Sequence, residues 1–141
     1  MTLDVILNRY KTECELKGVN FIFDVRLNNL SFVDDFDLVT ILDNLLDNAI
    51  EAAGITKEKS ITFETDNRNS YTVIIISNSC EQSPTTDNNR LITTKTDKTV
   101  HGLGLKSVSN TLQKYNGDID WAFLKDKNQF ITTVMLRPSK K

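Results

Sequence analysis

The chain has 141 residues with 39% apolar and 26% charged side chains, which is the size and composition of one globular domain. Its net charge of −2 comes from interspersed charges of both signs, which argues against nucleic acid or an anionic membrane surface as a partner. No apolar run approaches the roughly 20 residues of a membrane helix and no signal peptide opens the chain, so we expect a cytoplasmic domain.

Two elements are predicted in the first part of the chain. Apolar residues recur at helical spacing over residues 2–17, and Gly18 ends this leading helix, which we assign to 1–18. Residues 19–27 alternate apolar and polar side chains, which predicts a strand.

A long amphipathic helix is predicted over 36–53, capped by Asp34 or Asp35 and ended by Gly54 in a left-handed conformation. Its apolar positions share one face: Leu38, Val39, Leu42, Leu45, Leu46, Ala49 and Ala53. Its polar positions gather on the other face: Asn44, Asp47, Asn48 and Glu51. An asparagine inside a helix costs roughly half a kcal/mol relative to alanine, because its amide competes for backbone groups. The asparagine pair therefore indicates a function, with a merely solvated face as the alternative.

The chemistry open to this pair is specific. An asparagine carbonyl is a neutral, hard oxygen ligand that suits Mg²⁺ and does not repel a polyphosphate. Asn44 and Asn48 are therefore candidate catalytic residues, while Asp47 and Glu51 either hold metal-bound waters or are surface charges.

The middle of the chain contains a hairpin and then a long polar segment. Residues 60–66 and 71–78 read as strands, and the turn-forming residues between them predict that they pair. Residues 79–101 are polar and aperiodic, which is typical of a lid or binding loop when it occurs inside a compact domain. Lys95 in this segment is a candidate phosphate ligand, or a solvated lysine.

A further helix is predicted to open at the HGLGLKSV segment and to end at Gly117. Gly102 and Gly104 allow close approach of the backbone to a ligand, and unpaired amides at a helix start suit a phosphate. A glycine turn without a ligand is the alternative, and the segment is neither a Walker loop nor a Rossmann fingerprint. Lys106 is a weaker candidate for a phosphate contact.

Two strands, at 118–124 and 129–137, close the chain around a turn. The element order predicts an α+β fold, a two-layer α/β sandwich with a mixed or antiparallel sheet covered by helices on one face. The whole of 1–141 is expected to form a single domain.

The asparagine helix LDNLLDNAIEA, the strand ending in IIISN, the polar segment and the HGLGL turn together resemble the GHKL ATP-binding superfamily. Within it, the sequence is most similar to histidine kinases of Gram-positive peptide-sensing (quorum-type) systems. The resemblance covers nearly the whole chain and implies a Bergerat-type sandwich, with ATP between the asparagine helix and an ATP lid at 79–101. It also implies a catalytic domain that donates the γ-phosphate of ATP to a histidine on a separate dimerisation domain, with a response regulator downstream in two-component signalling.

The resemblance assigns roles to individual residues. Asn48 matches the position that coordinates Mg²⁺, and Asn44 matches the second position of the same motif, near the phosphates. Asn78 matches the position, usually an aspartate, that accepts a hydrogen bond from the adenine amine. The second glycine motif, whose amides cradle phosphate, is matched by Gly102, Leu103, Gly104 and Leu105.

The sequence departs from the family pattern in its first glycine motif, which reads NSCEQ, with Asn78 for the aspartate and Cys80 for the first glycine. An amide oxygen accepts more weakly than a carboxylate, so weaker nucleotide affinity is expected. Superfamily members that hydrolyse ATP carry glutamate at the position of Asn44. Asparagine cannot take up a proton, which disfavours hydrolysis and leaves transfer to an imidazole open.

The only histidine, His101, adjoins the glycine turn and lacks the context of a phosphoacceptor. The accepting histidine is therefore expected on an upstream dimerisation domain outside this chain, connected through the helix at 2–17, in a parent protein that is a membrane sensor. The isolated domain is expected to be a monomer. Two alternatives stay open: a stand-alone serine kinase of the anti-sigma type, and a degenerate module that binds a partner protein without catalysis.

Overall fold

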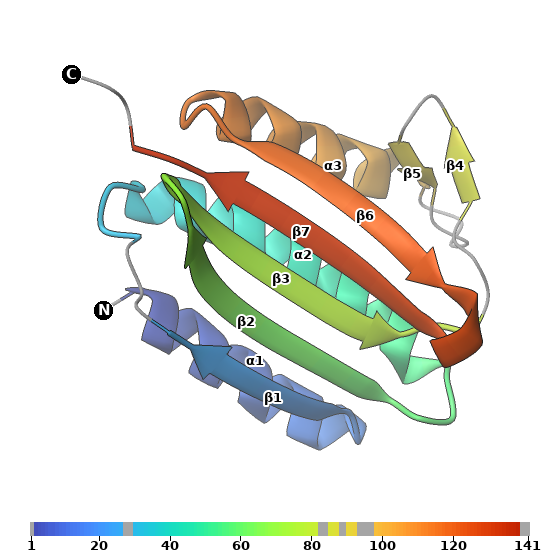
Figure 1. The fold of residues 1–141 in the computed structure, drawn as a ribbon. Coiled ribbons are helices and arrows are strands. Elements are labelled where there is room, and N and C mark those ends of the chain that lie inside the picture. The colour runs from blue at the N-terminus through green and yellow to red at the C-terminus, as the bar shows by residue number, and fades with distance from the viewer. Residues whose placement is uncertain (1, 27–29, 82–84, 88–89, 93–97, 139–141) are drawn as a thin grey trace.

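The computed structural model describes residues 2–26, 30–81, 85–87, 90–92 and 98–138, and for residue 2 and those between 85 and 105 it describes the backbone alone. The helices and strands are α1 (Thr2–Lys17), β1 (Asn20–Val25), α2 (Asp35–Gly54), β2 (Ser60–Arg68), β3 (Tyr71–Ser79), β4 (Thr85–Asp87), β5 (Arg90–Ile92), α3 (Lys98–Gln113), β6 (Asp118–Leu124), η1 (Lys125–Lys127) and β7 (Gln129–Leu136). Figure 1 shows the main sheet face-on with the helices behind it.

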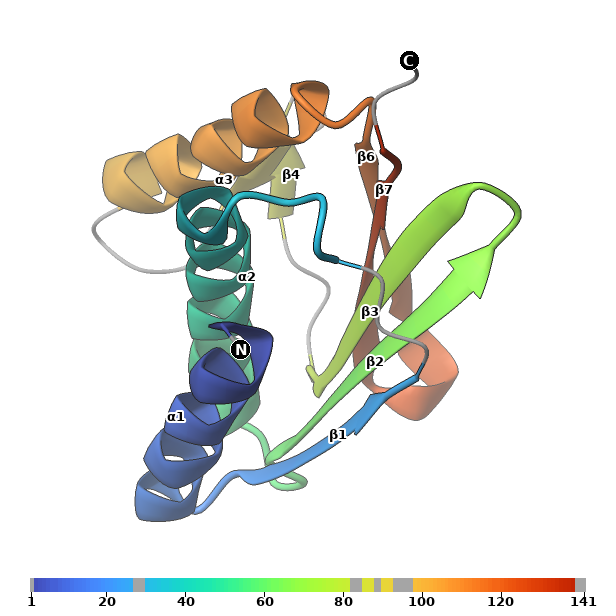
Figure 2. The ribbon, with the colours of Figure 1, turned by 90° about the vertical axis from the view of Figure 1, so that its left-hand side faces the viewer.

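The five-stranded sheet has the order β1-β2-β3-β7-β6. β1 and β2 are parallel, while the other neighbouring pairs are antiparallel. The parallel pair arises because α2 connects β1 to β2, and a crossover helix returns the chain to the same end of the sheet. Figure 2 shows α1, α2 and α3 together on one side of this sheet. The predicted two-layer α+β fold with a mixed sheet is confirmed.

The core lies between the two layers. On the sheet side, matched positions of β1, β2, β3 and β7 form a continuous buried row, for example Phe21, Ile61, Asn78 and Phe130. On the helix side, α2 contributes the apolar face that was predicted, with Ile41 and Ile50 added and Val39 only half-buried. No helix within the described ranges is long and apolar enough to cross a membrane.

α1 is an integral part of this core. Five of its side chains are buried: Leu3, Ile6, Leu7, Tyr10 and Cys14. The helix ends as predicted at Gly18, which has φ +73°, and the backbone amide of Val19 donates to the carbonyl of Cys14 at 2.8 Å. α1 therefore belongs to the folded domain and packs beside α2.

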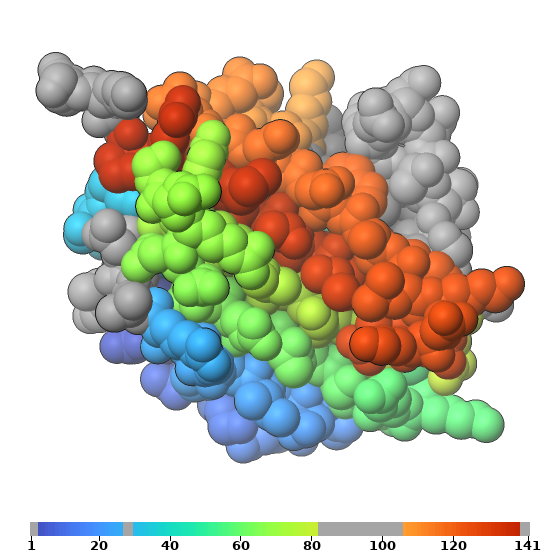
Figure 3. All heavy atoms as spheres, viewed as in Figure 1, coloured from blue at the N-terminus to red at the C-terminus, as the bar shows by residue number. Residues whose placement is uncertain are grey.

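None of the helices that the structure describes covers the outer face of the sheet, and Figure 3 shows the side chains of this face as a surface. Three of its paired positions carry exposed acidic residues, Asp24, Glu64 and Asp120. Alternation of buried and exposed residues along each strand follows from this arrangement, with one face against the helices and one in water.

Three local predictions are corrected by the structure. Gly54 is the last residue of α2 and does not have a positive φ; Ile55 caps the helix, with its amide donating to the carbonyl of Ala53. The polar segment is not free of regular structure, because it includes the hairpin of β4 and β5. α3 begins at Lys98, four residues before Gly102, so the glycine segment lies inside the helix and not at its start.

Candidate functional site

α2 supplies the central element of the candidate site. Asp34 caps it, its side chain accepting a hydrogen bond from the amide of Phe36, as predicted for one of the two aspartates. The buried apolar residues fix one face of α2 against the sheet, so the remaining faces of the helix point towards α1 and α3. Asp43 and Asp47 lie on the edge that faces α1, and Asn44 lies on the edge that faces α3.

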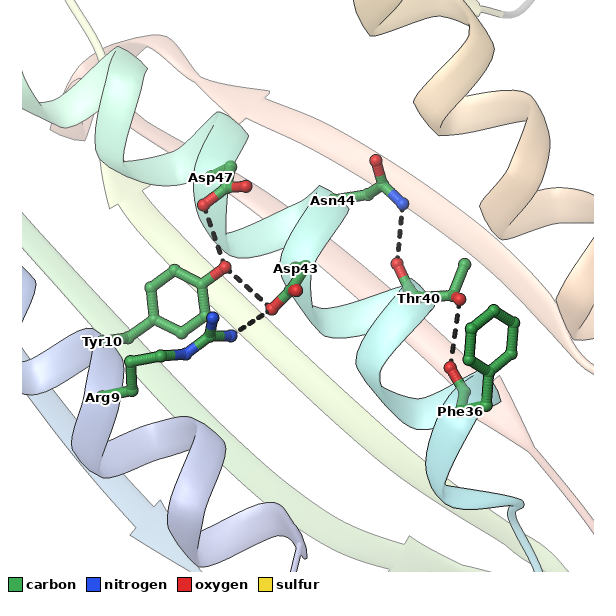
Figure 4. Close-up of polar contacts among 7 residues, drawn as sticks. All are labelled: Arg9, Tyr10, Phe36, Thr40, Asp43, Asn44 and Asp47. Carbon is green, nitrogen blue, oxygen red and sulfur yellow. Dashed lines mark hydrogen bonds and ion pairs between the residues drawn. The ribbon is translucent and has the colours of Figure 1, made fainter.

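Asn44 lies on the edge of α2 that faces α3 (Figure 4). It is half-buried, and its amide nitrogen donates to the carbonyl of Thr40 at 2.7 Å. This bond ties the nitrogen to the helix and turns the carbonyl oxygen away from it, which is the orientation that a cation ligand requires. Asn48, one turn later on the same side, is also half-buried. Neither asparagine is on the freely solvated face that the alternative interpretation required.

Asn78 lies at the end of β3 on the helix-covered face of the sheet and is buried. Its amide nitrogen donates to the carbonyl of Ser79 at 3.0 Å, which orients the side chain. The following residue, Cys80, is buried too, and its backbone amide donates to the carbonyl of Asn128 at 2.8 Å. The strand end that carries Asn78 is therefore anchored on both sides.

A buried hydroxyl network that the sequence did not reveal connects this strand end to α2. The Thr56 hydroxyl donates to the carbonyl of Ala53 at 2.7 Å and lies 2.8 Å from the Ser79 hydroxyl. The backbone amides of Lys59 and Ser60 donate to these two hydroxyls. The sequence indicates this network only weakly, because a threonine after a helix and a serine at the end of a strand are both common. The network fixes the end of α2 relative to Asn78.

A second unpredicted cluster joins α1 to α2 (Figure 4). The Tyr10 hydroxyl lies 2.9 Å from a carboxylate oxygen of Asp43 and 2.9 Å from one of Asp47. The Arg9 guanidinium forms an ion pair with Asp43 at 2.5 Å. Asp47 is exposed, but partial desolvation of its carboxylate beside α1, together with the charge of Asp43, raises its pKa against the opposing effect of the Tyr10 hydrogen bond. Burial, together with both carboxylates, raises the pKa of Tyr10.

A third cluster joins the start of α2 to the end of α3. The carboxylate of Asp37 is buried and accepts hydrogen bonds from the Tyr115 hydroxyl at 2.5 Å and from the ammonium of Lys114 at 3.2 Å. The hydrogen bond from Tyr115, supported by Lys114, holds the pKa of Asp37 below its ordinary value despite burial. This cluster ties the first turn of α2 to the two residues that follow α3.

The remaining predicted site residues are placed less completely. Gly102, Leu103, Gly104 and Leu105 lie in α3, past its first turn, where helical hydrogen bonds engage the backbone amides. The unpaired amides of a helix start are therefore those of 98–101, which include His101. Lys95 lies outside the described residues, and Lys106 is exposed on α3.

The donor set fits a magnesium nucleotide in its chemistry. The neutral amide oxygens of Asn44 and Asn48 are hard oxygen ligands of the kind that Mg²⁺ accepts while keeping waters and phosphate oxygens. Among the described residues there is no cluster of three histidine, cysteine or acidic side chains that could hold a metal ion by itself.

Comparison with known proteins gives a consistent assignment. The family model of the GHKL domain matches residues 33–137. The nucleotide-free catalytic domain of histidine kinase ThkA has a TM-score of 0.72 at 20% identity, over 97% of this chain and 93% of that one. Histidine kinase AdeS of Acinetobacter baumannii has a TM-score of 0.71 at 15% identity, over 99% of this chain and 64% of that one. At these identities the two structures establish the fold. No curated protein gives a significant match.

Proposed function

Because this chain belongs to the GHKL domain family, we propose that it binds Mg-ATP and donates the γ-phosphate to a histidine on a separate dimerisation domain. The observation that carries the proposal is the half-buried pair Asn44 and Asn48 on α2: Asn44 lies on the edge that faces α3 (Figure 4), and Asn48 follows one helical turn later. A fold shared with histidine kinase catalytic domains supports the same assignment.

Each site residue is proposed to contact a different part of the magnesium nucleotide. Asn48 is the proposed magnesium ligand, and Asn44 is proposed to contact the phosphates one turn earlier. Mg²⁺, when bound, neutralises charge on the phosphate oxygens during transfer. Asn78 accepts a hydrogen bond from the adenine amine, and the backbone at Gly102, Leu103, Gly104 and Leu105, with Lys95, contacts the phosphates. For the amides of this segment to do so, the first turns of α3 have to unwind, since they are helical here.

The proposed acceptor follows from the chemistry of Asn44. A water molecule needs a base to become a good nucleophile, and an amide cannot take up its proton. An imidazole is itself a competent nucleophile near neutral pH. Phosphoryl transfer to histidine therefore fits this site better than hydrolysis, and catalysis comes from positioning and charge neutralisation.

The wider setting of the domain is also a proposal. We infer a cytoplasmic, monomeric catalytic domain, with 1–18 as the leading helix and 79–101 as the ATP lid, within a membrane sensor of the Gram-positive peptide-sensing type. The absence of a phenylalanine-rich motif from residues 79–101 supports this subgroup. A response regulator receives the phosphate in a later step.

The test is transfer between separate proteins. The domain is incubated with Mg-ATP labelled at the γ-phosphate and with a histidine-bearing dimerisation domain from a kinase of this type. A phosphate that is acid-labile and alkali-stable on the acceptor, and that is lost with Asn48→Ala, supports the proposal. An acid-stable phosphate on a hydroxyl would indicate the serine-kinase alternative. A domain that binds no nucleotide at millimolar concentration would indicate a protein-binding module.

A further inference from the structure

Tyr10 is placed unusually for a core aromatic residue, because its hydroxyl reaches two carboxylates of a neighbouring helix. The ring is 2% exposed, and the hydroxyl lies 2.9 Å from both Asp43 and Asp47. Removing a phenolic hydroxyl from water is costly unless it is hydrogen-bonded, and here its single proton can be accepted by either of the two carboxylates, which lie at the same distance. The contact bridges 33 and 37 positions of the sequence, so it is a tertiary link between α1 and α2.

The two carboxylates directly precede the two asparagines of the candidate site. Asp43 is followed by Asn44, and Asp47 is followed by Asn48. Successive residues of an α-helix are 100° apart around its axis, so fixing one edge of α2 against α1 fixes where the neighbouring edge points. Figure 4 shows this arrangement, with the carboxylates directed at α1 and Asn44 on the side of α3.

We propose that Tyr10 is a positioning residue for the nucleotide site, which sets the rotation of α2 through Asp43 and Asp47 and thereby directs Asn44 and Asn48. This inference rests on the proposed function for the identity of the ligand. Apolar packing of α2 against the sheet is non-directional and permits small rotations, whereas a hydrogen bond constrains direction as well as distance. Under the proposed function, α1 leads to the phosphoacceptor domain, so a shift of α1 would change the setting of the asparagines.

The test compares Tyr10→Phe with a matched variant, Tyr115→Phe. Both changes remove one hydroxyl that bonds a carboxylate of α2, but Tyr115 contacts Asp37 in the first turn, away from the asparagines. Affinity for Mg-ADP is measured by calorimetry well below the melting temperature, so that both variants are fully folded. We expect Tyr10→Phe to weaken binding about fivefold. Tyr115→Phe is expected to lower the melting temperature without changing affinity. Equal affinities of Tyr10→Phe and the wild type would overturn the proposal.

A second arm tests whether Tyr10 acts through the carboxylates. In the double variant Asp43→Ala, Asp47→Ala, the hydroxyl has lost both partners, so adding Tyr10→Phe is expected to cause no further loss of affinity. The same fivefold loss in this background would show that Tyr10 acts by another route and would contradict the inference.

A third arm does not depend on the nucleotide. Amide hydrogen exchange at residues 43–48 is expected to be several-fold faster in Tyr10→Phe than in the wild type, while Tyr115→Phe accelerates exchange at the start of α2 instead. Unchanged exchange at 43–48 would refute the positioning role. A wild-type protein that binds no nucleotide would refute the proposed function alone, so the two failures are distinguishable.

Discussion

Removing the hydroxyl of Tyr115 tests whether the cluster at the start of α2 stabilises the fold as its geometry indicates. In Tyr115→Phe, the carboxylate of Asp37 loses its 2.5 Å hydrogen bond and keeps only Lys114 as a side-chain donor among the described residues. The aromatic ring remains, so its edge contact with Phe32, at a centroid distance of 6.0 Å, is preserved. The change therefore removes only the two hydrogen bonds of the hydroxyl, the one donated to Asp37 and a longer one accepted from the backbone amide of Asp34 at 3.1 Å.

The expected loss follows from the burial of the acceptor. Hydrogen bonds to charged groups contribute about 1.5–3 kcal/mol, and we take the lower end, about 1.5 kcal/mol, because Asp37 lies in the first helical turn. For a domain of this size that corresponds to a fall in melting temperature of about 5 °C. Lys114→Met is the comparison: the Lys114 side chain is 63% exposed, so losing its ion pair should change stability by less than about 0.5 kcal/mol. Urea denaturation, monitored by circular dichroism, measures the loss of stability in both variants.

The pH dependence of stability tests the same hydrogen bond. Tyr115 is the largest cause of the lowered pKa of Asp37, so the stability it provides is present above the ordinary value of 3.8 and is lost as pH falls through the folded-state pKa. The difference in free energy of unfolding between the wild type and Tyr115→Phe should therefore be largest at pH 6–7 and should decrease below about pH 4. A difference in free energy of unfolding that stays constant down to pH 3 would refute the reasoning. A loss of stability in Tyr115→Phe that is smaller than the loss in Lys114→Met would refute it as well.

Two further substitutions test other close contacts. Gly117→Ala would place a Cβ 2.4 Å from the carbonyl oxygen of Met135, a backbone atom that cannot move aside cheaply, so we expect a loss of about 2 kcal/mol in thermal or urea unfolding. Ala122→Gly, on the exposed position of a neighbouring strand, is the control and should cost no more than about 1 kcal/mol. Thr56→Val keeps the shape of the side chain but leaves the Ser79 hydroxyl without one of its partners. We expect the free energy of unfolding to fall by about 2 kcal/mol. A fall of less than about 0.5 kcal/mol would contradict the role of this network.

The elements that local chemistry determines were predicted well from the sequence. The spacing of apolar residues and the two candidate capping aspartates place α2 within one residue at each end, and Gly18 marks the end of α1. The hairpin of β2 and β3 followed from turn residues, with Asn69 at φ 58° in the left-handed region. These features depend on neighbours in the sequence and are therefore visible in it.

The errors have a common physical cause, which is that tertiary contacts override local preference. Gly104 lies inside α3 because a glycine in a helix costs only about 1 kcal/mol, less than packing Val108 and Leu112 into the core gains. Gly54 was expected in a left-handed cap, yet Thr56 satisfies the helix end with its own hydroxyl. The sequence predicts a mixed or antiparallel sheet but no strand order, and the parallel pairing of β1 with β2 is not predicted because pairing between distant segments is not encoded locally.

The candidate site was predicted only in part for the same reason. Asn44 and Asn48 were conspicuous because asparagine is costly inside a helix, and Asn78 was found through the family resemblance. Tyr10, by contrast, read only as an apolar position of α1, since its partners on α2 are more than thirty residues away. Contacts of this kind can be found only once the helices are placed.

Titration with Mg-ADP, monitored by calorimetry, tests the asparagine edge of α2 most directly. The wild type is expected to bind saturably in the presence of Mg²⁺ and weakly in its absence. Asn48→Ala should weaken binding about tenfold or more, as loss of one ligand to a charged group would. Asn8→Ala, an exposed asparagine on α1, should bind like the wild type. Binding that is indifferent to Asn48, or no binding at millimolar nucleotide, would contradict the account.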